Sequence, residues 1–193
     1  MEQTSTGIHL LTPRLVLRDH HWGDLPTHHA LLSDARAMYY LPDIRTGTVE
    51  ESEQNLRVAM GEIGKAERTY VFLRVEESVT GDHVGEIGYT VGSRCPLGAF
   101  VDVGYFLRPH HWGKGYAAEA LRGVLRYAFD EGGVLRVACG CVAENRASER
   151  VMQKAGLLWE YERKQAVWHE DRLLDRVGYR LLRQEWLAAQ GQP

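Results

Sequence analysis

The chain has 193 residues, 44% of them hydrophobic and 25% charged, and its formal net charge at pH 7 is -3. This length suits one domain with a well-buried core, and the composition is that of an ordinary globular protein. The net negative charge argues against nucleic-acid binding, which favours a basic surface. No apolar run reaches the length of about 18 residues that a membrane-spanning helix needs.

The first third of the chain is predicted to hold a strand and two helices. "RLVLRD" (14–19) alternates apolar and charged residues, as a half-buried strand does. A helix is expected within 24–37, with Asp24 as its N-cap and Pro26 in its first turn. A second helix is expected over 48–65.

The second helix carries a clear start signal, because Thr48 and Glu51 form a capping box. Two strands follow, over 69–76 and 83–91, and the turn at 80–82 joins them as a hairpin.

The rest of the chain is predicted to alternate strands with helices. The expected elements are a strand over 99–107, a helix over 114–130, a strand over 135–142, a helix over 146–156, and two strands near 158–167 and 172–182. This order indicates a mixed α/β fold and a single domain over 1–193.

The cysteines and the first residues bear on the compartment. Cys95, Cys139 and Cys141 are odd in number and form no CxxC pair, which favours a reducing interior. Cys139 and Cys141 share one face of a strand, where buried packing is the expected role rather than a nucleophile. "MEQTSTGIHLLTP" lacks the basic start and apolar core of a signal peptide. We therefore expect a cytoplasmic protein, monomeric or homodimeric, with no membrane or nucleic-acid partner.

A glycine-rich turn, "HHWGKGYAAEAL" (110–121), lies between a predicted strand and a predicted helix. Gly113 and Gly115 have no Cβ, so an anion could reach the backbone amides between Trp112 and Ala117. The helix dipole adds roughly half a positive charge at that end, and Lys114 could add a charge-assisted contact. The turn therefore predicts a site for a phosphate group.

Two common phosphate motifs do not fit this turn. A P-loop needs a hydroxyl residue after Gly-Lys, and here Gly115 and Tyr116 follow Lys114. A dinucleotide fingerprint needs an acidic residue about 20 positions on, at the end of a strand, and none is present.

Several separated motifs agree on one family. They are "TPRLVLRD" (12–19), "GEIGY" (85–89), "VGYFLRPHHWGKGYAAEAL" (103–121), "ENRASERVMQKAGL" (144–157) and "RLLRQEW" (180–186). Together they resemble the GNAT superfamily of acetyl-CoA-dependent N-acetyltransferases, and most closely the branch that contains the ribosomal-protein-alanine acetyltransferases. The likeness covers nearly the whole chain in the right order.

The resemblance implies a fold and a way of holding acetyl-CoA. The fold would be a splayed, mixed and mostly antiparallel sheet of about seven strands flanked by helices, with coenzyme A in the gap between strands 99–107 and 135–142. The implied cofactor-binding residues are Tyr105, Phe106, Leu107, Trp112, Gly113, Lys114, Gly115, Tyr116, Ala117, Asn145 and Ser148. The sequence departs mildly from the family pattern at His110, where Gln or Arg is usual.

Acetyl transfer to an amine needs a base, a donor for the charge that develops on the thioester oxygen, and a proton for the departing thiolate. The resemblance implies Glu160 as the base and Ser148 as the thiol partner. Glu86 and Asp102 are rival bases, because both lie on central strands and could face the cleft. For the donor we expect a backbone N–H within 103–107, with Phe106 as the first choice.

No metal site is expected, because the histidines form adjacent pairs without an i,i+4 pattern. His169 is expected to be a surface turn residue, while Tyr39, Tyr40, Leu41 and Trp168 are candidates for lining the acceptor side.

The predicted function is transfer of acetyl from acetyl-CoA to a primary amine by direct attack in a ternary complex. The nearest branch implies a protein or peptide N-terminal α-amine. The alternatives are a small-molecule amine, including an antibiotic, a coenzyme-A-binding module without turnover, and an interaction domain without a cofactor.

Overall fold

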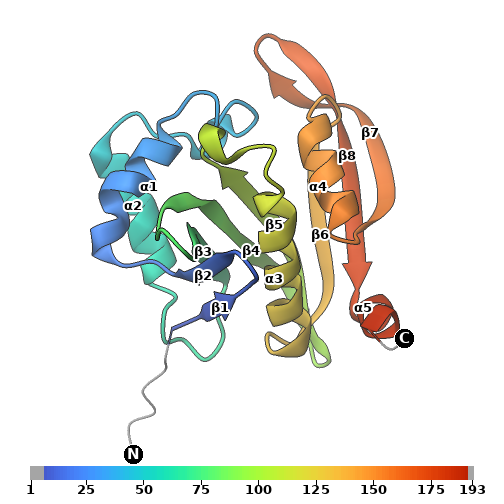
Figure 1. Cartoon of the computed structure of the whole chain (residues 1–193). Coiled ribbons are helices and arrows are strands. Elements are labelled where there is room, and N and C mark those ends of the chain that lie inside the picture. The colour runs from blue at the N-terminus through green and yellow to red at the C-terminus, as the bar shows by residue number, and fades with distance from the viewer. Residues whose placement is uncertain (1–6, 191–193) are drawn as a thin grey trace, which may run out of the picture.

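The computed structural model describes residues 7–190 and contains one sheet of eight strands in the order β1-β2-β3-β4-β5-β6-β8-β7 (Figure 1). The strands are β1 (His9–Leu11), β2 (Leu15–Asp19), β3 (Tyr70–Glu77), β4 (His83–Cys95), β5 (Gly98–Leu107), β6 (Val134–Val142), β7 (Leu158–His169) and β8 (Arg172–Leu182). All neighbouring pairs are antiparallel except β5 and β6, which are parallel. The predicted mixed, mostly antiparallel α/β fold is confirmed, and the eighth strand is the short β1.

The helices follow the predicted order. They are α1 (Leu25–Leu32), α2 (Val49–Met60), α3 (Tyr116–Asp130), α4 (Arg146–Lys154) and α5 (Arg183–Gln190), with short 3-10 turns η1 (Trp22–Asp24), η2 (Pro42–Ile44) and η3 (Pro109–His111). Helix α5 was not predicted. No helix within residues 7–190 has the length and apolarity to cross a membrane.

The first two helices differ from prediction in instructive ways. Asp24 occupies the N-cap position of α1, but its side chain makes no capping bond there. Instead, both of its carboxylate oxygens accept hydrogen bonds from Arg18, each at 2.8 Å. Helix α2 begins with the predicted capping box of Thr48 and Glu51 but ends at Met60, five residues early.

The two faces of the sheet pack against different helices. On β4, Ile87 and Tyr89 join the large core cluster that contains α3. Glu86 points the other way, to His28 of α1. Because side chains alternate along a strand, α3 and α1 cover opposite faces.

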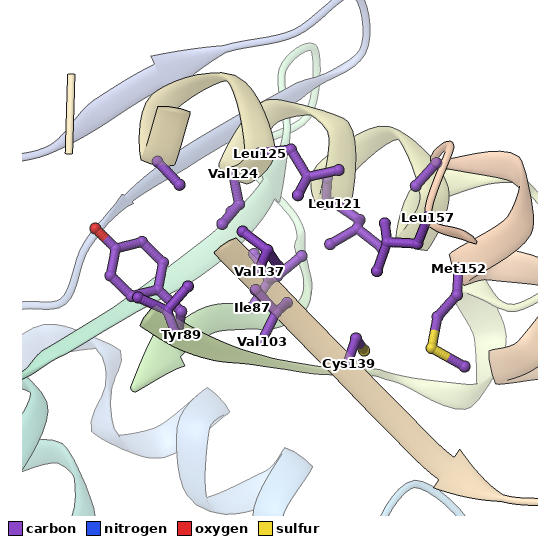
Figure 2. Packing of buried hydrophobic residues seen from close by; sticks show 14 of the residues in the cluster. Ile87, Tyr89, Val103, Leu121, Val124, Leu125, Val137, Cys139, Met152 and Leu157 are labelled. Atoms are coloured by element: carbon purple, nitrogen blue, oxygen red, sulfur yellow. The ribbon is translucent and has the colours of Figure 1, made fainter. Parts of the chain in front are cut away.

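Helix α3 supplies the centre of the main core. Leu121, Val124, Leu125 and Ala128, predicted from their spacing to share a face, are all fully buried. Figure 2 shows three of them lying over strand residues that include Ile87 and Val137. Burial of each of the Leu and Val side chains among them stabilises the fold by about 1.5–3 kcal/mol.

The sheet divides in its middle. Strands β5 and β6 pair only from Ala99, opposite Val134, to Asp102, opposite Ala138. Beyond that point β5 continues to Leu107 and β6 to Val142 without pairing with each other. We call this opening the fork, strands β1–β5 with α1 and α2 the N-terminal arm, and strands β6–β8 with α4 the C-terminal arm.

Candidate functional site

The glycine turn lies at the open end of the fork and leads into α3. Gly113 and Gly115 have φ values of 76° and 83°, a left-handed conformation that only glycine adopts without strain, and Gly115 is the N-cap of α3. A Cβ placed at Gly113 would meet nothing within 4 Å, so the turn is open on that side. Both positions therefore favour glycine because the turn requires positive φ angles there.

The amides of this turn are free to bind a ligand. Within the described residues, the backbone N–H groups from Gly113 to Ala118 have no hydrogen-bond partner, and Glu119 is the first residue whose N–H bonds back, to Gly115. Free N–H groups at a helix N-terminus attract anions. The turn thus has the free N–H groups that the predicted phosphate site requires.

Arg14 holds this turn in place, and sequence reasoning missed it. Its guanidinium donates to the Lys114 carbonyl oxygen at 3.0 Å and to Glu119 Oε2 at 2.7 Å, and it lies 4.7 Å from the centre of the Tyr116 ring. Thr12 also donates to Glu119, at 2.7 Å. The motif "TPRLVLRD" was the available signal, because it contains both Thr12 and Arg14.

Burial opposes ionisation of Glu119, but the hydrogen bonds from Thr12 and Arg14 hold the pKa of its carboxyl below the ordinary value. The carboxylate therefore stays charged and keeps Arg14 beside the turn.

The direction of the backbone groups on β5 can be derived from two hydrogen bonds. Ala99 donates its N–H to Gly133, on the β6 side, whereas Arg108 donates to Val84, on the β4 side. Backbone groups alternate direction along a strand, so those of Val103, Tyr105 and Leu107 face the fork. Phe106 N–H belongs to the ladder with β4, which does not support the expectation that it serves as the oxyanion donor.

Tyr105 and Ser148 meet across the fork. The Tyr105 hydroxyl donates to the Ser148 carbonyl oxygen at 3.0 Å and lies 2.8 Å from Ser148 Oγ. The Asn145 side chain caps α4 by accepting from Ser148 N–H at 3.0 Å. Burial raises the pKa of Tyr105, so its hydroxyl stays protonated at neutral pH. The structure thus brings together three of the predicted residues.

The three candidate bases lie in different surroundings. Asp102 forms, with Ala138, the last residue pair between β5 and β6 before the fork. Its side chain is exposed and has no hydrogen-bond or ion-pair partner among residues 7–190. Glu86 is buried and contacts histidines on the face that α1 covers. Glu160 lies on β7, two strands beyond β6, and accepts two hydrogen bonds from Arg136, at 2.7 and 2.9 Å.

The tip of the β7–β8 hairpin reaches the loop after α1. His169 is buried, with its ring 4.8 Å from that of Tyr39 and 5.7 Å from that of Tyr40, so the expectation of a surface turn residue was wrong. Glu170 Oε2 accepts a hydrogen bond from the Tyr39 hydroxyl at 2.6 Å. Trp168 is exposed.

The cysteines are all free thiols, and Cys139 and Cys141 are buried on one face of β6, as predicted. Burial raises the pKa of the Cys139 thiol to about 12, which makes it a poor nucleophile.

Two hollows, of 460 and 510 Å³, lie away from the fork. The first is lined by residues that include Arg68, Arg94 and Gly133, and the second by residues that include Leu11, Arg126 and Trp186. The candidate site is therefore assigned to the fork and its glycine turn on the backbone geometry and not to either hollow.

Comparisons with known proteins agree with this geometry. A family model described as acetyltransferase (GNAT) domain matches residues 14–158. The uncharacterized N-acetyltransferase YnaD of Bacillus subtilis (strain 168) is 29% identical over 184 residues, which cover 93% of this chain and 99% of YnaD.

Two solved structures share the fold. Spermidine N-acetyltransferase from Vibrio cholerae, in complex with CoA and spermine, superposes with a TM-score of 0.78 at 19% identity, covering 91% of this chain and 99% of that one. Ribosomal-protein-S5-alanine acetyltransferase from Vibrio fischeri gives 0.76 at 18% identity, covering 93% and 98%.

Proposed function

The chain belongs to the GNAT acetyltransferase family and is an acetyl-CoA-dependent N-acetyltransferase, and we propose that its acceptor is a protein or peptide N-terminal α-amine. The single observation that carries the choice of acceptor is the isolation of Asp102. It is the one carboxylate of the three candidates that has no cationic partner in the described residues. One free carboxylate at the fork suits an acceptor with one amine better than a polyamine.

The turn and the fork supply the binding groups for acetyl-CoA. We assign the pyrophosphate to the free amides of residues 113–117, with Lys114 as an added positive charge. The pantetheine arm is assigned to the backbone groups of Tyr105 and Leu107 that face the fork. Asn145 and Ser148 lie across from them on α4.

Acetyl-CoA supplies the reactive thioester. The side chains and backbone of the protein position the reactants and transfer the protons. We assign Asp102 as the group that accepts the amine proton, because it lies exposed at the base of the fork. The N–H of Tyr105, the first that faces the fork beyond the paired part of β5 and β6, is the proposed donor to the carbonyl oxygen. Ser148, hydrogen-bonded to the protonated Tyr105, is the proposed proton source for the thiolate.

The loop and hairpin that meet at Tyr39 and His169 are the proposed acceptor side. Their aromatic contacts and the Tyr39–Glu170 hydrogen bond join the two arms near the fork. We propose a cytoplasmic enzyme, consistent with its three free thiols.

The proposal on acetyl-CoA binding is tested with Gly113→Val, measured by calorimetric titration of acetyl-CoA. The branched side chain should strain the turn and cover the amides, abolishing the binding heat. Gly81→Val is the matched control, since Gly81 has the same φ of 76° and equally open space in the β3–β4 turn. Equal binding by the two variants would contradict the assignment of the turn.

The acceptor is tested by following thiol release from acetyl-CoA with N-terminal peptides, polyamines and aminoglycosides. Peptides should be the best acceptors. Faster release with a polyamine or an antibiotic would move the function to small-molecule acetylation. Binding without release for every amine would leave a coenzyme-A-binding module.

A further inference from the structure

A buried polar cluster lies on the α1 face of the sheet, apart from the proposed chemistry. It contains His20 from the segment after β2, His28 from α1, and Glu86 from β4, all nearly inaccessible to water. His28 Nδ1 lies 2.5 Å from Glu86 Oε1, and His20 Nε2 lies 3.9 Å from Glu86 Oε2. The acetyl transfer proposed above uses none of these contacts.

Apart from His28 Nδ1, which is hydrogen-bonded to Glu86, the ring nitrogens of the two histidines are unsatisfied within residues 7–190. Both ring nitrogens of His20, and Nε2 of His28, are buried without a hydrogen-bond partner in the described residues. A buried polar atom without a partner destabilises the fold. The cluster therefore contains buried nitrogen atoms that lack a hydrogen-bond partner in the described part of the chain. Of these, His20 Nε2 lies 3.9 Å from the carboxylate that His28 contacts.

The spacing of these atoms suits a metal ion. One ligand atom from each of His20, His28 and Glu86 lies within 4.8 Å of the other two. Tetrahedral zinc, with bonds of about 2.0–2.1 Å, holds its ligand atoms about 3.3 Å apart. The 2.5 Å separation of His28 Nδ1 and Glu86 Oε1 is a hydrogen bond that the ion would replace, and the 3.9 Å separation of His20 Nε2 and Glu86 Oε2 would have to shorten slightly.

The surrounding charges also favour an added cation. Arg18 contacts Asp24 and Glu76, and Arg74, which is paired across the strands with Glu86, contacts the same two acids. Two guanidinium groups thus face three carboxylates in a buried region. Burial of the excess negative charge is unfavourable unless a proton or a metal ion balances it.

A supporting partner for a metal-bound histidine is already in place. His20 Nδ1 lies 3.7 Å from Asp24 Oδ2, and Arg18 fixes that carboxylate. Metal-bound histidines commonly direct their second nitrogen at a carboxylate, which fixes the ring orientation.

We propose that His20, His28 and Glu86 form a structural site for a divalent transition-metal ion, with Zn²⁺ as the best match to two imidazoles and a carboxylate. The site ties α1 and the β2–α1 segment to the central strand β4. The expectation that the chain holds no metal rested on sequence spacing, and these three residues share no local pattern because only the fold brings them together.

The test measures metal directly in the full chain. Protein prepared without metal-affinity chromatography should contain one zinc per chain by mass spectrometry. Co²⁺ added to the chelator-treated protein should produce visible absorption bands of a bound ion. A hundredfold excess of Zn²⁺ over its Kd should raise Tm by roughly 5–10 °C.

Variants identify the ligands. His20→Gln, His28→Gln and Glu86→Gln should each abolish the Co²⁺ bands, and Asp24→Asn should weaken binding by about 10–100-fold. His83→Gln is the buried control, because His83 lies 3.7 Å from Glu86 but outside the group of three. His21→Gln is the exposed control next to His20.

The outcomes decide the proposal. Retained Co²⁺ bands in both controls and lost bands in the ligand variants support it. A wild-type protein with no zinc, no Co²⁺ bands and a Tm insensitive to Zn²⁺ overturns it and leaves a shared proton as the missing positive charge. Loss of the bands in His83→Gln to the same degree as in His20→Gln overturns the assigned ligand set.

Discussion

The two arms of the fork are built from different interactions. In the N-terminal arm, Arg18 joins β2 to η1 and β3 through mostly buried ion pairs with Asp24 and Glu76. In the C-terminal arm, the ion pairs of Lys164 and Arg172 are exposed. Buried pairs that lose one partner are costly, whereas exposed pairs contribute little. We therefore expect the N-terminal arm to be the stiffer wall of the site.

The proposed chemistry is divided between these arms. Asp102 belongs to the stiff arm, whereas Ser148 belongs to the other one, on α4. The four rungs from Ala99 to Asp102 and the Tyr105–Ser148 contact join the arms near the site.

The largest expected effect comes from Asp102, at the point where the arms separate. Asp102→Asn should lower kcat by roughly 10²- to 10⁴-fold, because the amide cannot accept the amine proton. Acetyl-CoA affinity, measured by titration, should stay unchanged. Glu160→Gln is the comparison, and a larger loss in that variant would move the base to the C-terminal arm.

The next effect contrasts the ion pairs of the arms. Arg18→Met leaves Asp24 and Glu76 without their shared guanidinium and should lower the free energy of unfolding by about 3 kcal/mol. Lys164→Gln should lower it by less than about 1 kcal/mol. Urea denaturation of both variants measures the difference, and similar losses would show that the arms do not differ.

A smaller, pH-dependent effect concerns Glu119, which anchors Arg14 at the turn. Its carboxyl has a folded-state pKa below the unfolded value, so its stabilisation is present above the unfolded pKa and is lost as the pH falls through the folded one. Glu119→Gln should therefore cost about 2 kcal/mol at pH 7, and progressively less as the pH falls below about 4.3 and through the lower folded-state pKa. Denaturation curves at several pH values test this, and a pH-independent difference would contradict it.

The smallest effect concerns the contact between the arms. Tyr105→Phe removes the hydroxyl that bonds to Ser148 and should lower the free energy of unfolding by about 1 kcal/mol. Hydrogen exchange should quicken in α4 while β3 and β4 stay protected. Uniform quickening in both arms would mean that the contact supports the whole sheet.

Much of this structure could be predicted because its signals are local. The Thr48–Glu51 capping box lies within four residues, and the apolar face of α3 repeats within one helix. The glycine turn is likewise a short pattern whose physical meaning, free amides at a helix start, depends on its own residues.

The parts that could not be predicted depend on distant partners. Asp24 was expected to cap α1, but Arg18 offers a stronger, charged contact from a neighbouring strand. His20, His28 and Glu86 come from three elements, and no spacing along the chain relates them. The direction of the Phe106 N–H follows from register, which a strand pattern alone does not give.

A sheet that stops pairing at Asp102 and Ala138 carries two open edges in its interior rather than at its margins. Such edges recruit other strands, and with them other molecules. The proposed pantetheine arm, an extended ligand with amide groups of its own, suits this space as a short substitute strand. We therefore expect the ligand-free protein to aggregate on storage. Added coenzyme A should suppress this aggregation.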